Sequence, residues 1–573
     1  MLFQKNQKKI SSILRTIYKS NLDNNDIDYL NDQILQIIKI FNKKNPKKKL
    51  KISEKTSLVI SYGDNIYSNK ANSIRVFQNF FKKNLIKYFN AVHFLPFYPS
   101  SSDSGFAVKD HYKIEKRIGS WSDIKKISKF NHVMADIVIN HSSARGLWFK
   151  NFLKKKRPGK DYFLTVNSKF DVSKVVRPRD HKLLKKIDIF KKSDYLWRTF
   201  SPDQIDLNFK NPVVLLRFIK IMIHLVNNGV RIFRLDAIAY LWKKNGTNCI
   251  NLNQTHQIVK LLRIITNLLN IQTVIITETN LPEKENLSYF GKNDEANWIY
   301  NFSLPPLLIH AFLFETSSNL VKWSKSLPSA KPGNSYLNFI ASHDGIGMRP
   351  TEGILNKKSL DNFLKRLKKN GSKFSFRKVQ DISKKVYEAN ITVFDALKKS
   401  DFDPDGKFSL QRYISAHAIM ISFEGIPAVY FNSLFGKSND ESKYIITGNN
   451  RDVNRYKWIY KNITKRLNDK NSKQSIFYQN LVKLLSVKKK QKAFHPNAKR
   501  TNINLGTKLF CFKRISLDKK QTIICITNLS SKIQSAHLNK IYNNWNNLIG
   551  SKIEKENKFL KLKPFETIWL SNK

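Results

Sequence analysis

The stretch from Gly229 to Leu241 constrains this chain more than any other part of its sequence. Its first half is apolar enough to form a short buried strand, except that it carries Arg234 and Asp236. Because alternate residues of a strand point to the same face, the guanidinium can meet the carboxylate and keep it ionised. Such a pair is either a structural ion pair at a strand end or a carboxylate nucleophile held in position. The other motifs of the chain decide between these interpretations.

Similar short apolar segments recur along the chain and alternate with helical patterns. This alternation predicts parallel βα units, and 573 residues are enough for a large barrel. We therefore expect an α/β fold: a (β/α)8 TIM barrel with inserted subdomains and a small C-terminal antiparallel β domain. The expected strands lie within segments 58–62, 91–97, 133–141, 229–235, 273–278, 337–344 and 428–431.

The same patterns divide the chain into three regions. Residues 1–56 carry apolar residues at helical spacing and are expected to form a helical extension on the outside of the main domain. Residues 57–490 are expected to form the catalytic barrel. Segments of about 142–205 and 345–392 are too long for simple loops, which predicts insertions that line its mouth. Residues 491–573 contain short strands and predict a β domain without catalytic residues.

The net charge is +59, from 102 Lys and Arg against 43 Asp and Glu, which would ordinarily suggest nucleic acid or an anionic membrane as a partner. The positive residues are spread over the whole chain, so we expect neither partner. No segment approaches about 18 consecutive apolar residues, and the N-terminus lacks the apolar core of a signal peptide. Cys249, Cys511 and Cys525 have no metal-ligand spacing and do not form an even set, which predicts a reducing cytoplasm.

Charged side chains follow several expected strands at their carboxyl ends. Asp236, Glu278 and Asp344 are three of them, and the carboxyl ends of barrel strands meet at the mouth where barrel enzymes build their active sites. Retaining glycosyl transfer needs two carboxyl groups, one ionised as nucleophile and one protonated as general acid. The three side chains provide such a pair and one further carboxylate. This chemistry requires neither a metal ion nor an organic cofactor, and we expect none.

The order of four motifs resembles the catalytic regions of the α-amylase family of glycoside hydrolases. The motifs are Ala135-Asp-Ile-Val-Ile-Asn-His141, Phe233-Arg-Leu-Asp-Ala237, Ile276-Thr-Glu278 and Ser342-His-Asp344. The resemblance implies that Asp236 is the nucleophile and Glu278 the general acid/base. It implies that Asp344 grips sugar hydroxyls.

Further motifs are similar to those of the sucrose-phosphorylase branch of that family. They include Val92-His-Phe-Leu-Pro-Phe-Tyr-Pro-Ser100, Asp103-Ser-Gly-Phe106, Phe200-Ser-Pro-Asp-Gln-Ile-Asp206 and Arg451-Asp-Val-Asn-Arg455. The resemblance implies that Arg234 orients the nucleophile. It also implies a closed pocket for one glucosyl unit, bound by Asp103, Phe106, His141, Phe200, Gln204, His343 and Arg451.

The acceptor side departs from the sucrose-phosphorylase pattern. Asn280 stands where sucrose phosphorylases tend to carry His, and Lys385 and Glu388 flank Tyr387 in place of the usual acceptor loop. Thr279-Asn-Leu-Pro282, Cys249 with Gln254-Thr-His256, and Arg349-Pro-Thr-Glu-Gly353 are more similar to the glucosylglycerate-phosphorylase type. Arg179, in Arg177-Pro-Arg179, resembles the phosphate-handling loop, although the pair is also consistent with a solvated surface.

The resemblance implies a retaining phosphorylase that transfers an α-glucosyl unit from a small glucoside to inorganic phosphate. The glucoside is glucosylglycerate or is sucrose-like, and a homodimer is what the branch suggests. An α-glucosidase or transglucosidase of the same family is the alternative. A carbohydrate-binding protein on an inactive barrel is a third interpretation, which the presence of all three carboxylates opposes.

Overall fold

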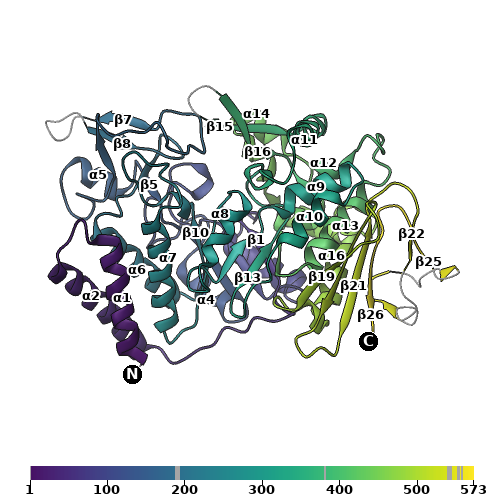
Figure 1. The fold of residues 1–573 in the computed structure, drawn as a ribbon, viewed down its shortest axis with the longest axis horizontal. Helices are drawn as coiled ribbons and strands as arrows, with labels where there is room; N and C mark the ends of the chain where they lie inside the picture. Colours follow the sequence, from purple (N-terminus) through teal and green to yellow (C-terminus); the bar gives the residue numbers. More distant parts are fainter. Residues whose placement is uncertain (1, 188–193, 380–382, 538–544, 551–554, 557–558) are drawn as a thin grey trace.

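A computed structural model of the chain describes residues 2–573 apart from 188–193, 380–382, 538–544, 551–554 and 557–558. Its centre is a closed barrel of eight parallel strands (Figure 1), which confirms the predicted (β/α)8 fold. The ring closes where β1 pairs with both β3 and β17. In chain order the strands are β1 (Leu58–Ser61), β3 (Ala91–Phe94), β4 (His132–Val138), β10 (Val230–Asp236), β11 (Val274–Thr277), β12 (Trp298–Tyr300), β13 (Ser335–Asn338) and β17 (Ile426–Tyr430).

The sequence patterns located seven of these strands and missed β12. It is only three residues long, and Asn297 and Asn301 flank it. Three residues are too few for a periodic apolar pattern, so β12 is defined by its pairing with β11 and β13.

Helices cover the outside of the barrel and connect its strands. Their ends carry the expected capping residues: Asn211 caps α6 with Pro212 in its first turn, and Ser120 and Asp123 form a capping box on α4. The barrel helices are α3 (Ser73–Phe80), α4 (Trp121–Ser128), α6 (Pro212–Asn227), α7 (Asn253–Leu268), α8 (Glu283–Leu287), α9 (Leu304–Leu313), α10 (Ser318–Ser326), α12 (Val393–Lys398), α13 (Ser409–Ser422), α15 (Tyr460–Asn468) and α16 (Lys473–Lys488).

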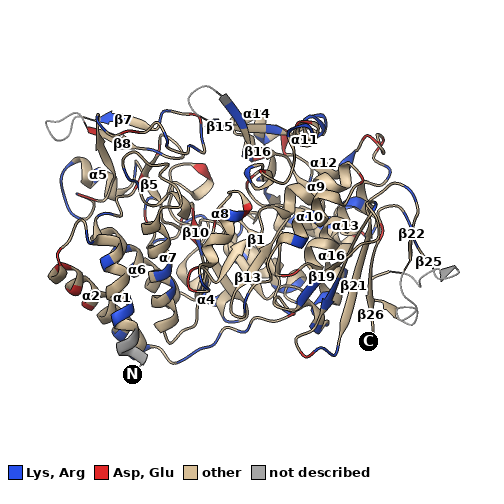
Figure 2. Ribbon diagram, in the orientation of Figure 1, with Lys and Arg blue, Asp and Glu red and all other residues tan. Residues whose placement is uncertain are grey.

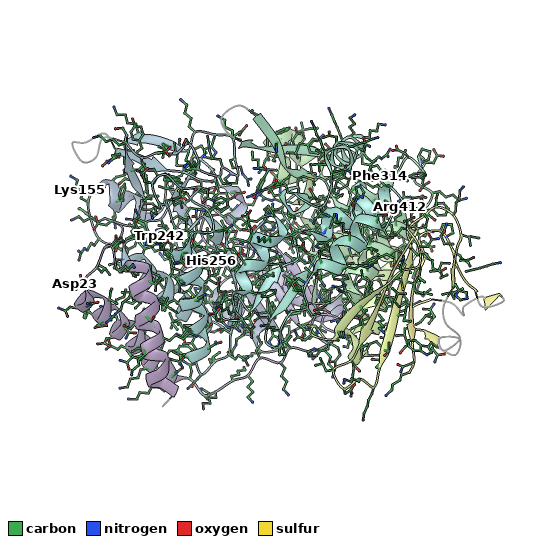
Figure 3. All side chains as sticks on the ribbon, in the orientation of Figure 1. Asp23, Lys155, Trp242, His256, Phe314 and Arg412 are labelled. Atoms are coloured by element: carbon green, nitrogen blue, oxygen red, sulfur yellow. The ribbon has the colours of Figure 1, made fainter. Side chains whose placement is uncertain are left out.

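Two N-terminal helices, α1 (Leu2–Tyr18) and α2 (Asn24–Lys44), pack on the outside of the barrel beside α6 and α7 (Figure 1). The Tyr18 hydroxyl donates to the Phe209 carbonyl at 3.1 Å, and its ring meets Trp242, which Figure 3 labels, edge-on. These contacts fix the end of α1 to the segment that precedes α6 and to the loop that follows β10.

Two insertions follow the carboxyl ends of barrel strands and lie along the upper edge of Figure 1. The first comes between β4 and β10 and contains β5 (His141–Ser143), α5 (Leu147–Leu153), β6 (Thr165–Asn167), β7 (Leu184–Ile187), β8 (Asp194–Trp197) and β9 (Gln204–Asp206). The second follows β13 and contains β14 (Ile346–Gly347), α11 (Lys357–Lys369), β15 (Lys373–Val379) and β16 (Ser383–Asn390). The short helix α14 (Glu441–Thr447) follows β17 at the same edge.

The C-terminal part is antiparallel. One sheet has the order β19-β20-β21-β26-β23, from β19 (Lys499–Ile503), β20 (Leu509–Ile515), β21 (Thr522–Asn528), β26 (Thr567–Ser571) and β23 (Asn546–Asn547). A smaller sheet joins β22 (Gln534–His537), β25 (Phe559–Leu562) and β24 (Lys555–Glu556). On the barrel side, Arg412 of α13 binds Asp403 at 2.7 Å and lies over the Phe565 ring (Figure 3). The boundaries 1–56, 57–490 and 491–573 stay a prediction.

Lys and Arg are distributed over all parts of the described chain (Figure 2). None of the helices in the described part combines the length and the apolar character that crossing a bilayer requires. Among the described side chains, no group of three or more His, Cys, Asp or Glu is arranged to hold a metal ion.

Candidate active site

Arg234 lies at the centre of a buried charge network at the carboxyl end of β10. Its Nη1 donates to Asp236 Oδ1 at 2.6 Å and also to Asp136, which stands opposite it on β4. Asp136 in turn lies 2.7 Å from His93 Nε2. The contact expected from the spacing of Arg234 and Asp236 is therefore present. One guanidinium anchored on Asp136 holds Asp236 at the mouth of the barrel.

Glu278, directly after β11, faces the same mouth. The N–H of Ala237 donates to Glu278 Oε2 at 2.9 Å, and Ala237 has a left-handed backbone with φ of 52°. This uncommon conformation turns the chain immediately after Asp236, so that its N–H is directed at Glu278.

Burial raises the pKa of both Asp236 and Glu278; the charge of Glu278 adds to the rise at Asp236, and the charge of Asp344 adds to the rise at Glu278. The pair therefore favours one shared proton. Arg234 is hydrogen-bonded to Asp236, whereas its Nη2 is 4.0 Å from Glu278 Oε1. The contact with Arg234 therefore favours ionisation of Asp236 and leaves the shared proton to Glu278. This division is the one that a nucleophile and a general acid require.

Asp344 is the third carboxylate, and arginines surround it. Arg451 Nη1 lies 2.8 Å from Asp344 Oδ1, and Arg455 Nη2 is 3.9 Å away. Although burial acts to raise it, these charges hold the pKa of Asp344 well below its usual range. The neighbouring His343 has its pKa lowered by burial to about 3, so it is neutral. Asp344 is an ionised acceptor for hydroxyl groups.

Aromatic rings form the walls of the cavity. Phe106 stacks on His343 with ring centroids 5.0 Å apart, and Phe200 lies 5.3 Å from the ring of His141. His141 Nε2 is 3.1 Å from the Phe106 carbonyl and 3.0 Å from the amide of Gln204. The predicted donor-side residues therefore line the cavity and also contact one another.

Asp103 occupies a strained loop at the far side of the cavity. Asp103, Ser104 and Gly105 all have positive φ, of 51°, 49° and 111°. Arg455 Nη1 donates to Ser104 Oγ at 2.9 Å and lies 3.6 Å from Asp103. A second clamp comes from Asp203, whose carboxylate accepts hydrogen bonds from the hydroxyls of the preceding serines, 101 and 102. These contacts hold Asp103 in a conformation that a free loop would rarely adopt.

Behind the donor residues lies a buried ion pair that the sequence motifs did not single out. Lys243 Nζ lies 2.5 Å from Asp206 and donates to Asn140 Oδ1 at 2.9 Å. The Asp206 carboxylate also accepts from the N–H and the hydroxyl of Thr199. Asn140 and Thr199 immediately precede His141 and Phe200 in sequence. The pair therefore positions two walls of the cavity without lining it.

On the acceptor side, the hairpin of β15 and β16 carries Tyr387 and Glu388. Ser375 pairs with Glu388 and Phe376 pairs with Val386, so Tyr387 is the extra residue of a β-bulge. A bulge allows two consecutive residues to face one cavity, and both line it here. Glu388 is 2% exposed.

Glu388 is paired with Arg451. Arg451 donates to it twice, with Nε to Oε2 at 3.1 Å and Nη2 to Oε1 at 2.5 Å. Arg451 shares its charge with Asp344, so it weakens the repulsion between Glu388 and an anionic ligand without removing it.

Arg179 comes from the first insertion and lies across the mouth from that hairpin. Its guanidinium is 5.1 Å from the Tyr387 ring and 6.0 Å from the Phe200 ring, and it donates to the Pro178 carbonyl. Asn280 lies against Gly347, where an added Cβ would stand 2.3 Å from Asn280 Oδ1.

The cavity is lined by all the predicted site residues except Lys385. Lys385 is exposed on the hairpin, opposite Arg377, so the structure does not bring it to the acceptor side. Sequence reasoning did not assign Tyr240 and Tyr300, which line the cavity, or Arg455. Arg455 ends the quoted Arg451-Asp-Val-Asn-Arg455 motif and could have been found there. The tyrosines carry no such pattern.

The barrel, with an Arg-held carboxylate and a protonated partner at its mouth, is the architecture of an α-amylase-type enzyme. The sequence matches the family described as "Alpha amylase, catalytic domain" over residues 86–346. A similar solved structure is that of sucrose 6F-phosphate phosphorylase from Thermoanaerobacter thermosaccharolyticum, with a TM-score of 0.72 and 24% identity. That similarity covers 84% of this chain and 94% of the other, and it supports the fold.

Two curated relatives are closer in sequence. Glucosylglycerate phosphorylase of Escherichia coli strain K12 is 36% identical, covering 90% of this chain and 92% of the relative. Glucosylglycerate phosphorylase of Spirochaeta thermophila is 35% identical, covering 91% of each. The chain therefore belongs to the α-amylase family, within the group that contains the glucosylglycerate and sucrose phosphorylases, and it is a glycoside phosphorylase.

Proposed function

We propose that this enzyme transfers the α-glucosyl unit of glucosylglycerate to inorganic phosphate, releasing glycerate and forming α-glucose 1-phosphate. The observation that carries the proposal is the unequal contact of Arg234 with the two carboxyl groups: Nη1 donates to Asp236 at 2.6 Å, whereas Nη2 is 4.0 Å from Glu278. The similarity to glucosylglycerate phosphorylases over most of the chain supports the choice of glucoside.

In the first step, a carboxylate oxygen of Asp236 attacks the anomeric carbon of the glucoside. The glycosidic C–O bond breaks, and Glu278 gives its proton to the leaving oxygen. The products of this step are free glycerate and a covalent glucosyl ester of Asp236. Asp344 and Arg451 bind sugar hydroxyls, while Phe106 and Phe200 exclude water from the ring.

In the second step, an oxygen of hydrogen phosphate attacks the same carbon and the ester bond to Asp236 breaks. The phosphate proton passes to Glu278, which restores the general acid, and two displacements give net retention. Arg179 provides the positive charge for phosphate at the mouth, because no carboxylate among the described residues forms an ion pair with it.

We further propose that the enzyme works in the cytoplasm, that it forms a homodimer and that it does not use nucleic acid. Three buried free thiols support a reducing compartment. Size measurement in solution tests the dimer.

The deciding experiment runs the reaction in reverse. Purified protein with α-glucose 1-phosphate is offered D-glycerate, glycerol, fructose, fructose 6-phosphate or glucose separately, and phosphate release is measured. We expect glycerate to be the best acceptor. Preference for fructose would make the enzyme a sucrose phosphorylase with an altered acceptor side. If no acceptor releases phosphate faster than water alone does, the glucosidase alternative is favoured.

A further inference from the structure

Arg349 lies close behind the acceptor side of the cavity, and no part of the proposed mechanism uses it. It begins a short 3-10 helix (Arg349–Thr351) two residues after Gly347, which lines the cavity. The residue is only 6% exposed. A buried guanidinium ordinarily has all its donors matched, because unpaired buried charge is unfavourable.

Two of the three guanidinium nitrogens of Arg349 lack a hydrogen-bond partner in the part of the chain that the structure describes. Its Nε and Nη1 are buried and have no hydrogen-bond partner among the described residues. The neighbouring carboxylate is Glu285, whose Oε1 is 3.9 Å from Nη2, beyond hydrogen-bond distance. The other oxygen of Glu285 already accepts from Asn251 Nδ2 at 2.6 Å, and the Glu285 side chain is 39% exposed. Arg349 is therefore a buried cation without a close counter-ion.

Tyr240 connects Arg349 to the reacting groups. It lines the cavity, and its hydroxyl is buried without a hydrogen-bond partner in the described part of the chain. Burial raises the pKa of this hydroxyl, Arg349 opposes the rise and Glu278 adds to it. Within the described residues, the Tyr240 hydroxyl is therefore an unpaired donor in the cavity wall, and Arg349 is a cation without a close counter-ion two residues from Gly347 of the same wall.

The other arginines near Tyr240 are less suited to a second anion. Arg377 donates to Glu352 at 2.6 Å and so has its counter-ion. Arg179 stacks on Tyr387 at the mouth, where phosphate enters. The proposed reaction involves two anions, phosphate and glycerate. Two cations near the acceptor side, Arg179 and Arg349, lack a close carboxylate among the described residues.

We propose that Arg349, together with the Tyr240 hydroxyl, binds the carboxylate of the acceptor and so selects a small hydroxy acid over a neutral polyol. This inference rests on the proposed function, because it names the group that distinguishes glycerate from glycerol. The carboxylate accepts hydrogen bonds from the phenol and from the guanidinium, and the adjacent hydroxyl is directed at Glu278 and the glucosyl carbon. Arg179 remains for phosphate.

The test compares two acceptors that differ at this group. Phosphate release from α-glucose 1-phosphate is measured with D-glycerate and with glycerol, and the ratio of the two kcat/KM values is the readout. Loss of a charge-assisted contact in Arg349→Gln should lower the glycerate-to-glycerol ratio by about 10- to 100-fold. Arg349→Lys should keep part of the preference, and Tyr240→Phe should lower it less than Arg349→Gln.

The matched control is Lys385→Gln, which removes a positive charge from the exposed face of the neighbouring hairpin. Its ratio should stay within about twofold of wild type, because a solvent-exposed charge is screened. An equal loss of glycerate and glycerol activity in Arg349→Gln would overturn the proposal in favour of a structural role. A rise in the KM for phosphate with an unchanged ratio would overturn it in favour of a phosphate site.

A separate measurement distinguishes failure of this inference from failure of the proposed function. If wild-type protein releases no phosphate with glycerate, the proposed function fails. The inference is then decided by inhibition of acceptor-independent glucose 1-phosphate hydrolysis. Inhibition by glycerate in wild type that is lost in Arg349→Gln supports a carboxylate site, and equal inhibition or none in both overturns it. Thermal unfolding of each variant identifies any that fails to fold, and in that case Arg349→Lys and Tyr240→Phe decide the outcome.

Discussion

At the scale of single residues, the arrangement around Arg234 assigns different roles to two similar carboxyl groups. Asp236 is buried and Glu278 half-buried, and this desolvation raises the pKa of both. Arg234 is anchored on Asp136 and contacts Asp236, so its charge stabilises one carboxylate far more than the other. The network beneath them therefore favours ionisation of Asp236, as the proposed division between nucleophile and acid requires.

Replacement of the nucleophile is the most direct test of this assignment. We expect Asp236→Asn to lower kcat by on the order of 10⁴-fold or more, because the amide cannot form the glucosyl ester. The isosteric side chain should keep the free energy of unfolding within about 1 kcal/mol of wild type. Initial rates of phosphate release and urea unfolding check both expectations. Activity within about tenfold of wild type, at equal purity, would contradict the assignment.

The raised pKa of Glu278 predicts how the rate depends on pH. A general acid must be protonated, so kcat/KM for a glucoside with a poor leaving group should fall as pH rises through this pKa. Burial moves that fall to higher pH than an exposed Glu would show. Glucosyl fluoride needs little protonation of its leaving group, so it should lack this alkaline fall in its first step.

Glu278→Gln is the companion variant. It should slow the natural glucoside by about 10²- to 10⁴-fold and slow formation of the glucosyl-enzyme from glucosyl fluoride far less. Pre-steady-state fluoride release measures that step alone. Equal losses on the two substrates would argue that another group is the acid.

Much of the donor side could be predicted from sequence, because its residues follow strands whose carboxyl ends a closed barrel brings together. Asp236, Glu278 and Asp344 are far apart in the chain yet line one cavity. The motif that begins at Arg349 was noted for the acceptor side, but a binding role for its guanidinium was not predicted. That role depends on guanidinium N–H groups that have no hydrogen-bond partner among the described residues, and a sequence alone does not show which donors are left unpaired.

At the scale of secondary-structure elements, the bulge in β16 explains why the acceptor side was harder to predict. Regular alternation would place Lys385 and Tyr387 on one face and Glu388 on the other. The extra residue at Tyr387 lets Tyr387 and Glu388 both line the cavity, while Lys385 is exposed. Whether a strand contains a bulge depends on its partner strand, which the local sequence does not reveal.

The buried pair Lys243–Asp206 makes a prediction about the segments that carry His141 and Phe200. Lys243→Met leaves the Asp206 carboxylate buried with only neutral partners, so we expect a destabilisation of about 3–5 kcal/mol. Because the walls of the donor cavity lose their anchor, KM for the glucoside should rise as well. Urea unfolding and steady-state kinetics measure the two effects.

The control for this prediction is the double variant Lys243→Met/Asp206→Asn, which removes the unpaired charge. It should recover part of the lost stability, since an amide is less costly to bury than a carboxylate. If the single and double variants were equally unstable, the destabilisation would come from lost packing, and the positioning role of the ion pair would be contradicted.

At the scale of the whole molecule, the barrel follows from the order of apolar segments, since repeated strand–helix units have few other ways to close. The order of apolar segments did not predict strand β12. Its three residues are held by neighbours on both sides, so the eighth strand is a consequence of closure and not of its own pattern.

The net charge of +59 provides the last prediction, since such a charge is typical of nucleic-acid-binding proteins. The blue segments of Figure 2 occur on the N-terminal helices, the insertions and the C-terminal sheet alike. A duplex in contact with one side of the molecule would therefore meet only a fraction of these charges. Affinity then depends on a few phosphate contacts, and counter-ion release makes such binding weaken steeply with salt.

We expect the protein to bind duplex DNA at low salt and to show a Kd weaker than about 1 μM at about 0.15 M salt. Fluorescence anisotropy with a labelled duplex across a salt series measures this. Polyglutamate of similar length is the control, because a surface that attracts any polyanion should bind both with a similar salt dependence. Submicromolar affinity for DNA at physiological salt, with polyglutamate unbound, would show that the charge forms a specific nucleic-acid surface and would contradict the prediction. Addition of DNA should also leave phosphorolysis unchanged at that salt, because the cavity lies at the barrel mouth and the Lys and Arg residues are spread over the whole molecule.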